Sequence, residues 1–186
     1  MSTLLYSATI SLDGYLAGPG GDMSWLRPYL RPTPRIDALQ QDIRALLVGA
    51  RTHHGDDPNR GTEQEGAFGG TWSGPVFVVT HHPPADPSAD PSTTFVPDVA
   101  SGIAAARAAA GDGYVNVLGA DVARQCLDLG ELDEVLAIVV PVFLGDGTPF
   151  FRQEGGRQVE FEPLVVESVG DASYLWLRVR RSGQPA

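Results

Sequence analysis

Hydrophobic residues in this chain gather in short runs, separated by polar, glycine-rich or proline-rich segments. Apolar and β-branched runs of about four to eight residues between turn residues are typical of buried strands. The pattern predicts strands at 4–11, 45–48, 76–80, 114–118 and 135–140. Proline and glycine end several of these runs, as they often end strands in folded proteins.

Three segments between the predicted strands have the composition or spacing of helices. In segment 36–44, Ile36, Leu39 and Ile43 fall on one helical face. In segment 122–129, Val122, Cys126 and Leu129 do the same, and Gly130 follows as a helix stop. Segment 101–110 is rich in alanine and is predicted to form the third helix.

The C-terminal part alternates apolar and polar residues in segments 158–167 and 174–181, as a two-stranded antiparallel ribbon does. Gly170 and Asp171 supply a turn between them. Strands that alternate with helices and end in such a ribbon predict an α/β fold with a mainly parallel central sheet and an antiparallel C-terminal edge. Segment 55–75 is expected to be a long surface loop, and segment 81–97 to be mostly irregular.

No repeat or long linker divides the chain, so a single domain is expected over residues 1–182, with a frayed tail at 183–186. Hydrophobic residues make up 42% of the 186, which argues against disorder. The net charge of −10 argues against binding to nucleic acid or to anionic membranes. We expect a cytoplasmic protein, because we find no signal peptide and no apolar run of about 20 residues.

Lysine is absent, which excludes chemistry that depends on a lysine side chain, and Cys126 is the only cysteine. Its place on the apolar helix face favours a small buried residue over a nucleophile. The pairs His53-His54 and His81-His82, with Asp56 and Asp57 nearby, raise the question of a metal. Adjacent histidines point in diverging directions and lack the spacing of zinc ligands, so no metal site is predicted.

Three predicted strands end in turns that suit a phosphate. Gly49 to Thr52 follows one strand, Thr80 to His82 another, and Gly119 to Asp121 a third. Glycine lets the backbone approach a phosphate closely, and arginine and hydroxyl groups then hold its charge. The carboxyl ends of parallel strands meet at one sheet edge, so the three turns are expected to reach one elongated ligand. The alternative is that these glycines only end their strands.

Several segments carry a resemblance to a known family: SATISLDGYLAGPGGDMSW, LLVGARTH, GPVFVVT and VLGADVARQCLDLGELDEVLAIVVPVFLGDGTPFF. In this order they resemble the dihydrofolate-reductase-like family. The likeness is strongest to the C-terminal reductase domain of the bifunctional riboflavin-biosynthesis deaminase-reductase. The resemblance implies the three-layer fold of that family, a homodimer, and an NADPH-dependent reductase. The implied substrate is a small heterocycle or sugar imine, such as 5-amino-6-(5-phosphoribosylamino)uracil.

The resemblance also implies which residues bind NADPH. It assigns the pyrophosphate to the turn around Gly119 and the helix start after it, and a 2′-phosphate to Arg51. The full implied set is Ala8, Leu16, Gly49, Arg51, Thr52, Thr80, His81, Leu118, Gly119, Ala120, Asp121 and Val122. Of these, Ala8 and Leu16 would flank the nicotinamide, and Thr80 would face the adenosine.

Two acids are candidate catalytic residues, each with a structural alternative. Asp37 either protonates or orients the substrate ring or is an ordinary acid in the first turn of a helix. Asp13 either touches the substrate or stabilises the SLDG turn.

Trp72, in the long loop, either covers a planar ligand or joins Phe68 in anchoring the loop.

The chain departs from the family pattern, because Ala120 replaces a second glycine and Asp121 adds a negative charge beside the expected phosphate. Two other functions therefore stay open. One is a binding protein that keeps the pocket without turnover. The other is a module that uses a flavin or deazaflavin.

Overall fold

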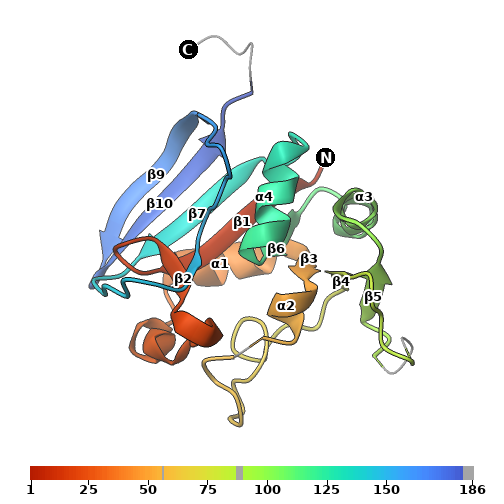
Figure 1. Cartoon of the computed structure of the whole chain (residues 1–186), viewed down its shortest axis with the longest axis horizontal. Helices are drawn as coiled ribbons and strands as arrows, with labels where there is room; N and C mark the ends of the chain where they lie inside the picture. Colours follow the sequence, from red (N-terminus) through yellow and green to blue (C-terminus); the bar gives the residue numbers. More distant parts are fainter. Residues whose placement is uncertain (56, 87–89, 182–186) are drawn as a thin grey trace.

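The computed structural model describes residues 1–55, 57–86 and 90–181. These residues form an eight-stranded sheet in the order β5-β4-β3-β6-β1-β7-β10-β9 (Figure 1). The sheet strands are β1 (Thr3–Ile10), β3 (Ile43–Gly49), β4 (Val76–Val79), β5 (Thr93–Val96), β6 (Tyr114–Leu118), β7 (Glu134–Val139), β9 (Phe161–Val169) and β10 (Ala172–Val179). The first six strands in this order pair in parallel, and β10 and β9 add an antiparallel edge.

Helices cover both faces of the sheet, which gives three layers (Figure 1). On one face, Leu39 of α1 (Pro34–Asp42) packs against strand residues such as Leu5 and Leu136. On the other face, α3 (Val99–Ala110) and α4 (Ala120–Asp128) pack on residues such as Leu4 and Tyr6. Consecutive residues of β1 thus serve opposite layers, as the alternation of side chains along a strand requires.

Shorter elements lie at the carboxyl edge of the parallel strands. They are β2 (Tyr15–Ala17), which pairs with β8 (Thr148–Pro149), the 3-10 helices η1 (Pro19–Gly21) and η2 (Ser24–Tyr29), and α2 (Ala50–His53). The long loop after α2 lies at the same edge (Figure 1). The polypeptide outside the three layers is therefore concentrated where the parallel strands end.

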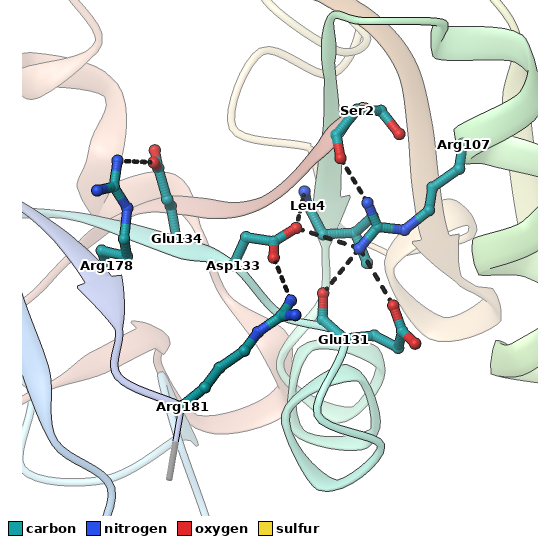
Figure 2. Close-up of polar contacts among 8 residues, drawn as sticks. All are labelled: Ser2, Leu4, Arg107, Glu131, Asp133, Glu134, Arg178 and Arg181. Atoms are coloured by element: carbon teal, nitrogen blue, oxygen red, sulfur yellow. Dashed lines mark hydrogen bonds and ion pairs between the residues drawn. The ribbon is translucent and has the colours of Figure 1, made fainter. Parts of the chain in front are cut away.

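An ion-pair network joins distant parts of the chain (Figure 2). The Arg107 guanidinium of α3 donates to the Ser2 carbonyl, to the Glu131 carbonyl and carboxylate, and to Asp133 Oδ2 at 3.1 Å. Asp133 also accepts from the Leu4 amide at 2.9 Å and from Arg181 at 2.7 Å. The network ties α3, the start of β1 and the segment after β10 to the residues that precede β7.

The predicted α/β class and its antiparallel C-terminal edge are confirmed. Segment 81–97 was expected to be mostly irregular, and no sequence pattern indicated β5, which Thr93–Val96 forms beside β4. The first helix begins at Pro34 and ends at Asp42, so Ile43 starts β3 instead of belonging to the helix. The predicted tail at 183–186 lies outside the described residues, as does Asp56.

Within the described residues, no helix has the length and apolar character needed to cross a membrane.

Candidate active site

The turns after β3 and β6 lie side by side at the carboxyl edge of the sheet. Val48 pairs with Leu118, so Gly49 and Gly119 leave neighbouring strands at the same level. A Cβ on Gly49 would lie 3.1 Å from Val122 Cγ2 of α4. The two predicted turns therefore belong to one place in the fold, which their sequence separation alone does not require.

Gly119 makes the closest approach in this region. Its φ of 106° is one that L side chains rarely adopt, and a Cβ there would lie 2.5 Å from Thr52 Oγ1. Any larger residue would collide with Thr52 as well as strain the backbone. Because Gly119 has no side chain, its backbone can approach a bound phosphate closely.

The amino end of α4 starts at this glycine. The Gly119 carbonyl accepts the first helical hydrogen bond, from the Ala123 amide at 3.0 Å, and no side chain among the described residues caps the helix. The amides of Ala120, Asp121 and Val122 therefore precede the helical ladder and lack partners within it. A helix start with free N–H groups attracts anions, particularly phosphates.

Two charged residues flank the helix start. Partial burial opposes ionisation of Asp121, but hydrogen bonds from Arg124 (3.0 Å) and Gln125 (2.9 Å) and the charge of Arg51 outweigh it and lower the pKa of the Asp121 carboxyl. Asp121 is therefore ionised at neutral pH. Arg51 of α2 is close enough to interact electrostatically with Asp121. Its side chain is exposed, so a ligand phosphate could bind it.

Thr80 and His81 follow β4, the strand beyond β3. The Thr80 amide donates to the Val96 carbonyl at 2.9 Å, and its hydroxyl accepts from the His82 amide at 3.0 Å. His81 is exposed. The pKa of the nearby Asp98 carboxyl is lowered chiefly by hydrogen bonds from the Ser101 amide and hydroxyl, and the charge of His81 adds to this. This turn lies on the same sheet edge as the other two, two strands away from β6.

Ala8 of β1 and Leu16 of β2 both pack against the core layer under α3 and α4. β1 is the neighbour of β6, on the side away from β3. Ala8 and Leu16 thus lie on the other side of Gly119 from Thr80. An elongated ligand along this edge would pass Thr80, then Gly119, then Ala8 and Leu16.

Both oxygens of the Asp13 carboxylate accept hydrogen bonds. Ser11 Oγ donates to it at 2.7 Å, and the amides of Leu144 and Gly145 donate at 3.1 and 2.7 Å. Desolvation would raise the pKa of Asp13, but these hydrogen bonds more than compensate and lower it. The contacts support the alternative in which Asp13 stabilises its turn and fixes the loop after β7 to it.

Asp37 lies in the first turn of α1, where its side chain is exposed. The neighbouring residue Arg35 pairs with Glu167 of β9, which holds this end of the helix to the antiparallel edge. A catalytic role for Asp37 stays a prediction. The residue is placed as an ordinary acid of a first helical turn would be, near the positive end of the helix dipole.

The long loop after α2 is attached to the protein at two points. Phe68 and Trp72 pack against the core layer under α1, which supports the alternative in which they anchor the loop. The Arg27 guanidinium of η2 donates to the Pro58 carbonyl and so links this loop to the segment between β2 and α1. Within the described residues, no group of three or more His, Cys, Asp or Glu side chains is arranged to hold a metal ion.

Sequence reasoning missed a polar pair inside the sheet. Ser7 Oγ of β1 donates to Asn116 Oδ1 of β6 at 2.8 Å, and Asn116 is fully buried. Its Nδ2 has no partner among the residues that the structure describes, which costs about 1–3 kcal/mol for a buried amide. The available sign was an asparagine in the middle of the apolar run that forms β6.

Fold and site together define an α/β protein of the dihydrofolate-reductase-like class, with a site suited to a phosphorylated ligand at the carboxyl edge. Residues 2–173 match the family model of the RibD C-terminal domain, so the chain belongs to that family. A comparison with curated proteins found no match.

Solved structures share the fold at low sequence identity. A Shewanella sp. PV-4 protein named for riboflavin biosynthesis has a TM-score of 0.74 and 22% identity, over 96% of this chain and 99% of that one. A Thermotoga maritima diaminohydroxyphosphoribosylaminopyrimidine deaminase/5-amino-6-(5-phosphoribosylamino)uracil reductase has a TM-score of 0.64 and 19% identity. That match covers 96% of this chain but only 57% of the Thermotoga chain. A Corynebacterium diphtheriae pyrimidine reductase-like protein has a TM-score of 0.60 and 16% identity, over 97% and 93% of the two chains.

Proposed function

We propose that this protein is an NADPH-dependent reductase that transfers a hydride to a small heterocyclic or sugar-imine substrate. The observation that carries the proposal is the meeting of Gly119, Thr52 and the free amino end of α4 at one point of the sheet edge. A pyrophosphate suits this place because the amides of Ala120 to Val122 precede the first helical hydrogen bond and Gly119 carries no Cβ. Membership of the RibD C-terminal domain family supports the choice of a reductase.

Different residues along the sheet edge bind different parts of the coenzyme. The amides of Ala120 to Val122 bind the pyrophosphate beside Gly119, and Arg51 binds the 2′-phosphate with its guanidinium. Gly49, Thr52 and Leu118 form the walls at this point, and Thr80 and His81 meet the adenosine. Ala8 and Leu16 flank the nicotinamide ring, where bound NADPH supplies the hydride.

The substrate we favour is one like 5-amino-6-(5-phosphoribosylamino)uracil. The support is that a protein of the same fold is named for reduction of this compound, and another for pyrimidine reduction. In this scheme Asp37 supplies or orients a proton, and Asp13 holds the loop after β7 in place.

The test is a coupled measurement of binding and turnover. NADPH and NADP⁺ are titrated into the protein by calorimetry, and NADPH oxidation at 340 nm is then followed with the deaminated pyrimidine as substrate. Saturable binding with substrate-dependent oxidation supports the reductase. Absence of nicotinamide binding at millimolar concentration would reject it and leave a flavin or deazaflavin cofactor to be tried.

A non-catalytic binding protein is the second candidate, and Asp121 favours it. An ionised carboxylate in the first turn of α4 repels a phosphate at the same helix end. Weak binding without oxidation, with every candidate pyrimidine, would support this candidate.

We also propose a cytoplasmic homodimer. β9 is the last strand of the sheet, and Val166 on it is 65% exposed, which leaves apolar surface and unpaired backbone for a second copy. On the adjacent β10, Leu175, Trp176 and Leu177 are half-buried, whereas Tyr174 is buried in the core. Light scattering after size-exclusion chromatography distinguishes a dimer from a monomer.

A further inference from the structure

The amino end of α4 carries an acid that does not bind the backbone of its own helix start. Asp121 lies in the first turn of α4, two positions after the N-cap residue Gly119. A carboxylate at such a position is well placed to accept from the free amides of the helix start. Within the described residues, however, the hydrogen bonds that Asp121 accepts come only from side chains.

Two side chains one turn further along the helix bind the two oxygens of this carboxylate. Arg124 Nη2 donates to Oδ1 at 3.0 Å, and Gln125 Nε2 donates to Oδ2 at 2.9 Å. An ionised carboxylate only accepts, so Gln125 presents its amide nitrogen to it. Partners three and four positions later lie toward the carboxyl end of the helix, so they draw the carboxylate away from the helix start. Arg124 and Gln125 thus form a clamp on Asp121.

The arginine of the clamp is fixed from its other side as well. Arg124 Nη1 donates to Asp128 Oδ2 at 2.8 Å, and Arg157 Nη1 lies 3.6 Å from Asp128 Oδ1. The Asp121 side chain is 53% exposed, so packing does not hold it in place. Charges linked in a network keep their geometry better than a single exposed pair does. The position of the Asp121 carboxylate therefore depends on the clamp.

A released Asp121 carboxylate would compete for the groups that we assign to the coenzyme. The amides of Ala120 to Val122 are assigned to the pyrophosphate, and they are within the same helical turn as Asp121. Arg51 is assigned to the 2′-phosphate and already interacts electrostatically with Asp121. Carboxylates and phosphates are both anions that accept hydrogen bonds from such donors. Occupation of either group by Asp121 would therefore exclude a phosphate.

We propose that Arg124 and Gln125 are positioning residues that hold the Asp121 carboxylate away from the start of α4 and so keep this helix end open for the phosphates of the coenzyme. This proposal rests on the proposed function. Neither side chain contacts the coenzyme in this scheme, because both act through Asp121. The clamp also accounts for an acid beside a phosphate site, the feature that otherwise counts against coenzyme binding.

The test is a double-mutant cycle between the clamp and the acid that it holds. Binding of NADP⁺ and of inorganic pyrophosphate is measured by calorimetry on the wild type, Arg124→Ala, Asp121→Ala and the double variant. Arg124→Lys is the conservative variant, since it keeps the charge. Arg157→Ala is the matched control, because Arg157 is an exposed arginine that also pairs with an acid of α4. Thermal melting of each variant establishes that it is folded.

Arg124→Ala is expected to weaken the binding of both ligands at least about fivefold, because it frees the carboxylate to compete with them. In the Asp121→Ala background the same substitution should change binding by less than about twofold, since no carboxylate is left to release. Arg124→Lys should keep most of the affinity. Arg157→Ala should leave binding within about twofold of the wild type, because its charge is exposed and remote from the helix start.

Two results of the cycle would overturn the proposal. One is a loss in Arg124→Ala that persists at full size without Asp121, which would mean that Arg124 contacts the phosphate itself. The other is unchanged binding in Arg124→Ala.

Failure of the proposed function is a separate outcome. If the cycle holds for pyrophosphate while NADP⁺ does not bind, the clamp stands and the coenzyme assignment falls. If NADP⁺ binds and the cycle shows no coupling, only this proposal falls. Binding of neither ligand by the wild type at millimolar concentration would overturn both.

Discussion

Thr52 and Gly119, which are 67 positions apart in the chain, meet so closely that Gly119 has no room for a side chain. A Cβ there would lie 2.5 Å from Thr52 Oγ1 and 3.4 Å from Thr52 Cβ. The contact joins the turn after β3 to the turn after β6. It shows that two glycine turns, each ambiguous in the sequence, lie against each other at the sheet edge.

The first prediction concerns this contact. Gly119→Ala is expected to cost about 1–3 kcal/mol in unfolding free energy through backbone strain. It should also weaken NADPH binding by at least about tenfold, because the collision with Thr52 shifts the turn proposed to hold the pyrophosphate. Denaturant unfolding and calorimetry measure the two effects. The matched control is Gly111→Ala, where φ is also positive (61°) but no heavy atom lies within 4 Å of the new Cβ.

That control should lose stability and keep its affinity for NADPH. Adding Thr52→Ala to Gly119→Ala removes the closer of the two contacts and should recover part of the stability. Unchanged coenzyme affinity in Gly119→Ala would show that the pyrophosphate does not lie at this turn.

The second prediction concerns charge at the start of α4. Asp121→Asn removes a negative charge next to the proposed pyrophosphate and should tighten NADPH binding about two- to fivefold at low salt. The gain should shrink as salt rises, since exposed charges are screened. Asp128→Asn is the control, because Asp128 also pairs with Arg124 but lies at the far end of the helix. Equal effects of the two variants would contradict the placement.

The third prediction concerns pH and Asp13. The folded-state pKa of Asp13 is lowered, so its carboxylate stabilises the fold above the ordinary value of 3.8. That stability is lost as pH falls through the lowered folded-state pKa. Asp13→Asn should therefore be less stable than the wild type at pH 7, and the difference should vanish in strong acid. Thermal melts from pH 7 to pH 2 test this, and a difference that is constant with pH would contradict it.

The fourth prediction concerns the network around Arg107 (Figure 2). The Arg107 side chain is 25% exposed and holds Glu131 and Asp133. Arg107→Ala should cost about 2 kcal/mol, less than the loss of a fully buried pair because water screens part of the interaction. Arg181→Ala, with a side chain that is 62% exposed, should cost under about 1 kcal/mol. Urea unfolding at neutral pH compares them, and equal costs would contradict this ranking.

Much of the fold could be predicted because the central strands of the sheet are buried on both faces. Apart from Asn116 in β6 and Glu134 at the start of β7, these two strands are apolar runs, which the sequence pattern marks clearly. β5 was missed because it has only four residues, two of them threonine, and follows a proline-rich segment. Ile43 was assigned to a helix because its spacing from Leu39 fits one, whereas its burial comes from the start of β3.

The candidate site was only partly predictable for a different reason. The turns at Gly49 and Gly119 carry recognisable residue types, and parallel pairing brings them together. The Ser7–Asn116 contact depends on the register of β1 against β6, which no local pattern specifies. The engagement of Asp13 with Leu144 and Gly145 likewise joins segments about 130 residues apart in sequence, so only the folded chain reveals it.

The most direct test of the account is a comparison of NADPH and NADH binding to the wild type and to Arg51→Ala by calorimetry. The account predicts that the wild type prefers NADPH by at least about tenfold, the value of one bidentate arginine–phosphate contact. It predicts that Arg51→Ala binds the two coenzymes equally by weakening NADPH alone. Equal weakening of both coenzymes, or no binding of either at millimolar concentration, would contradict it.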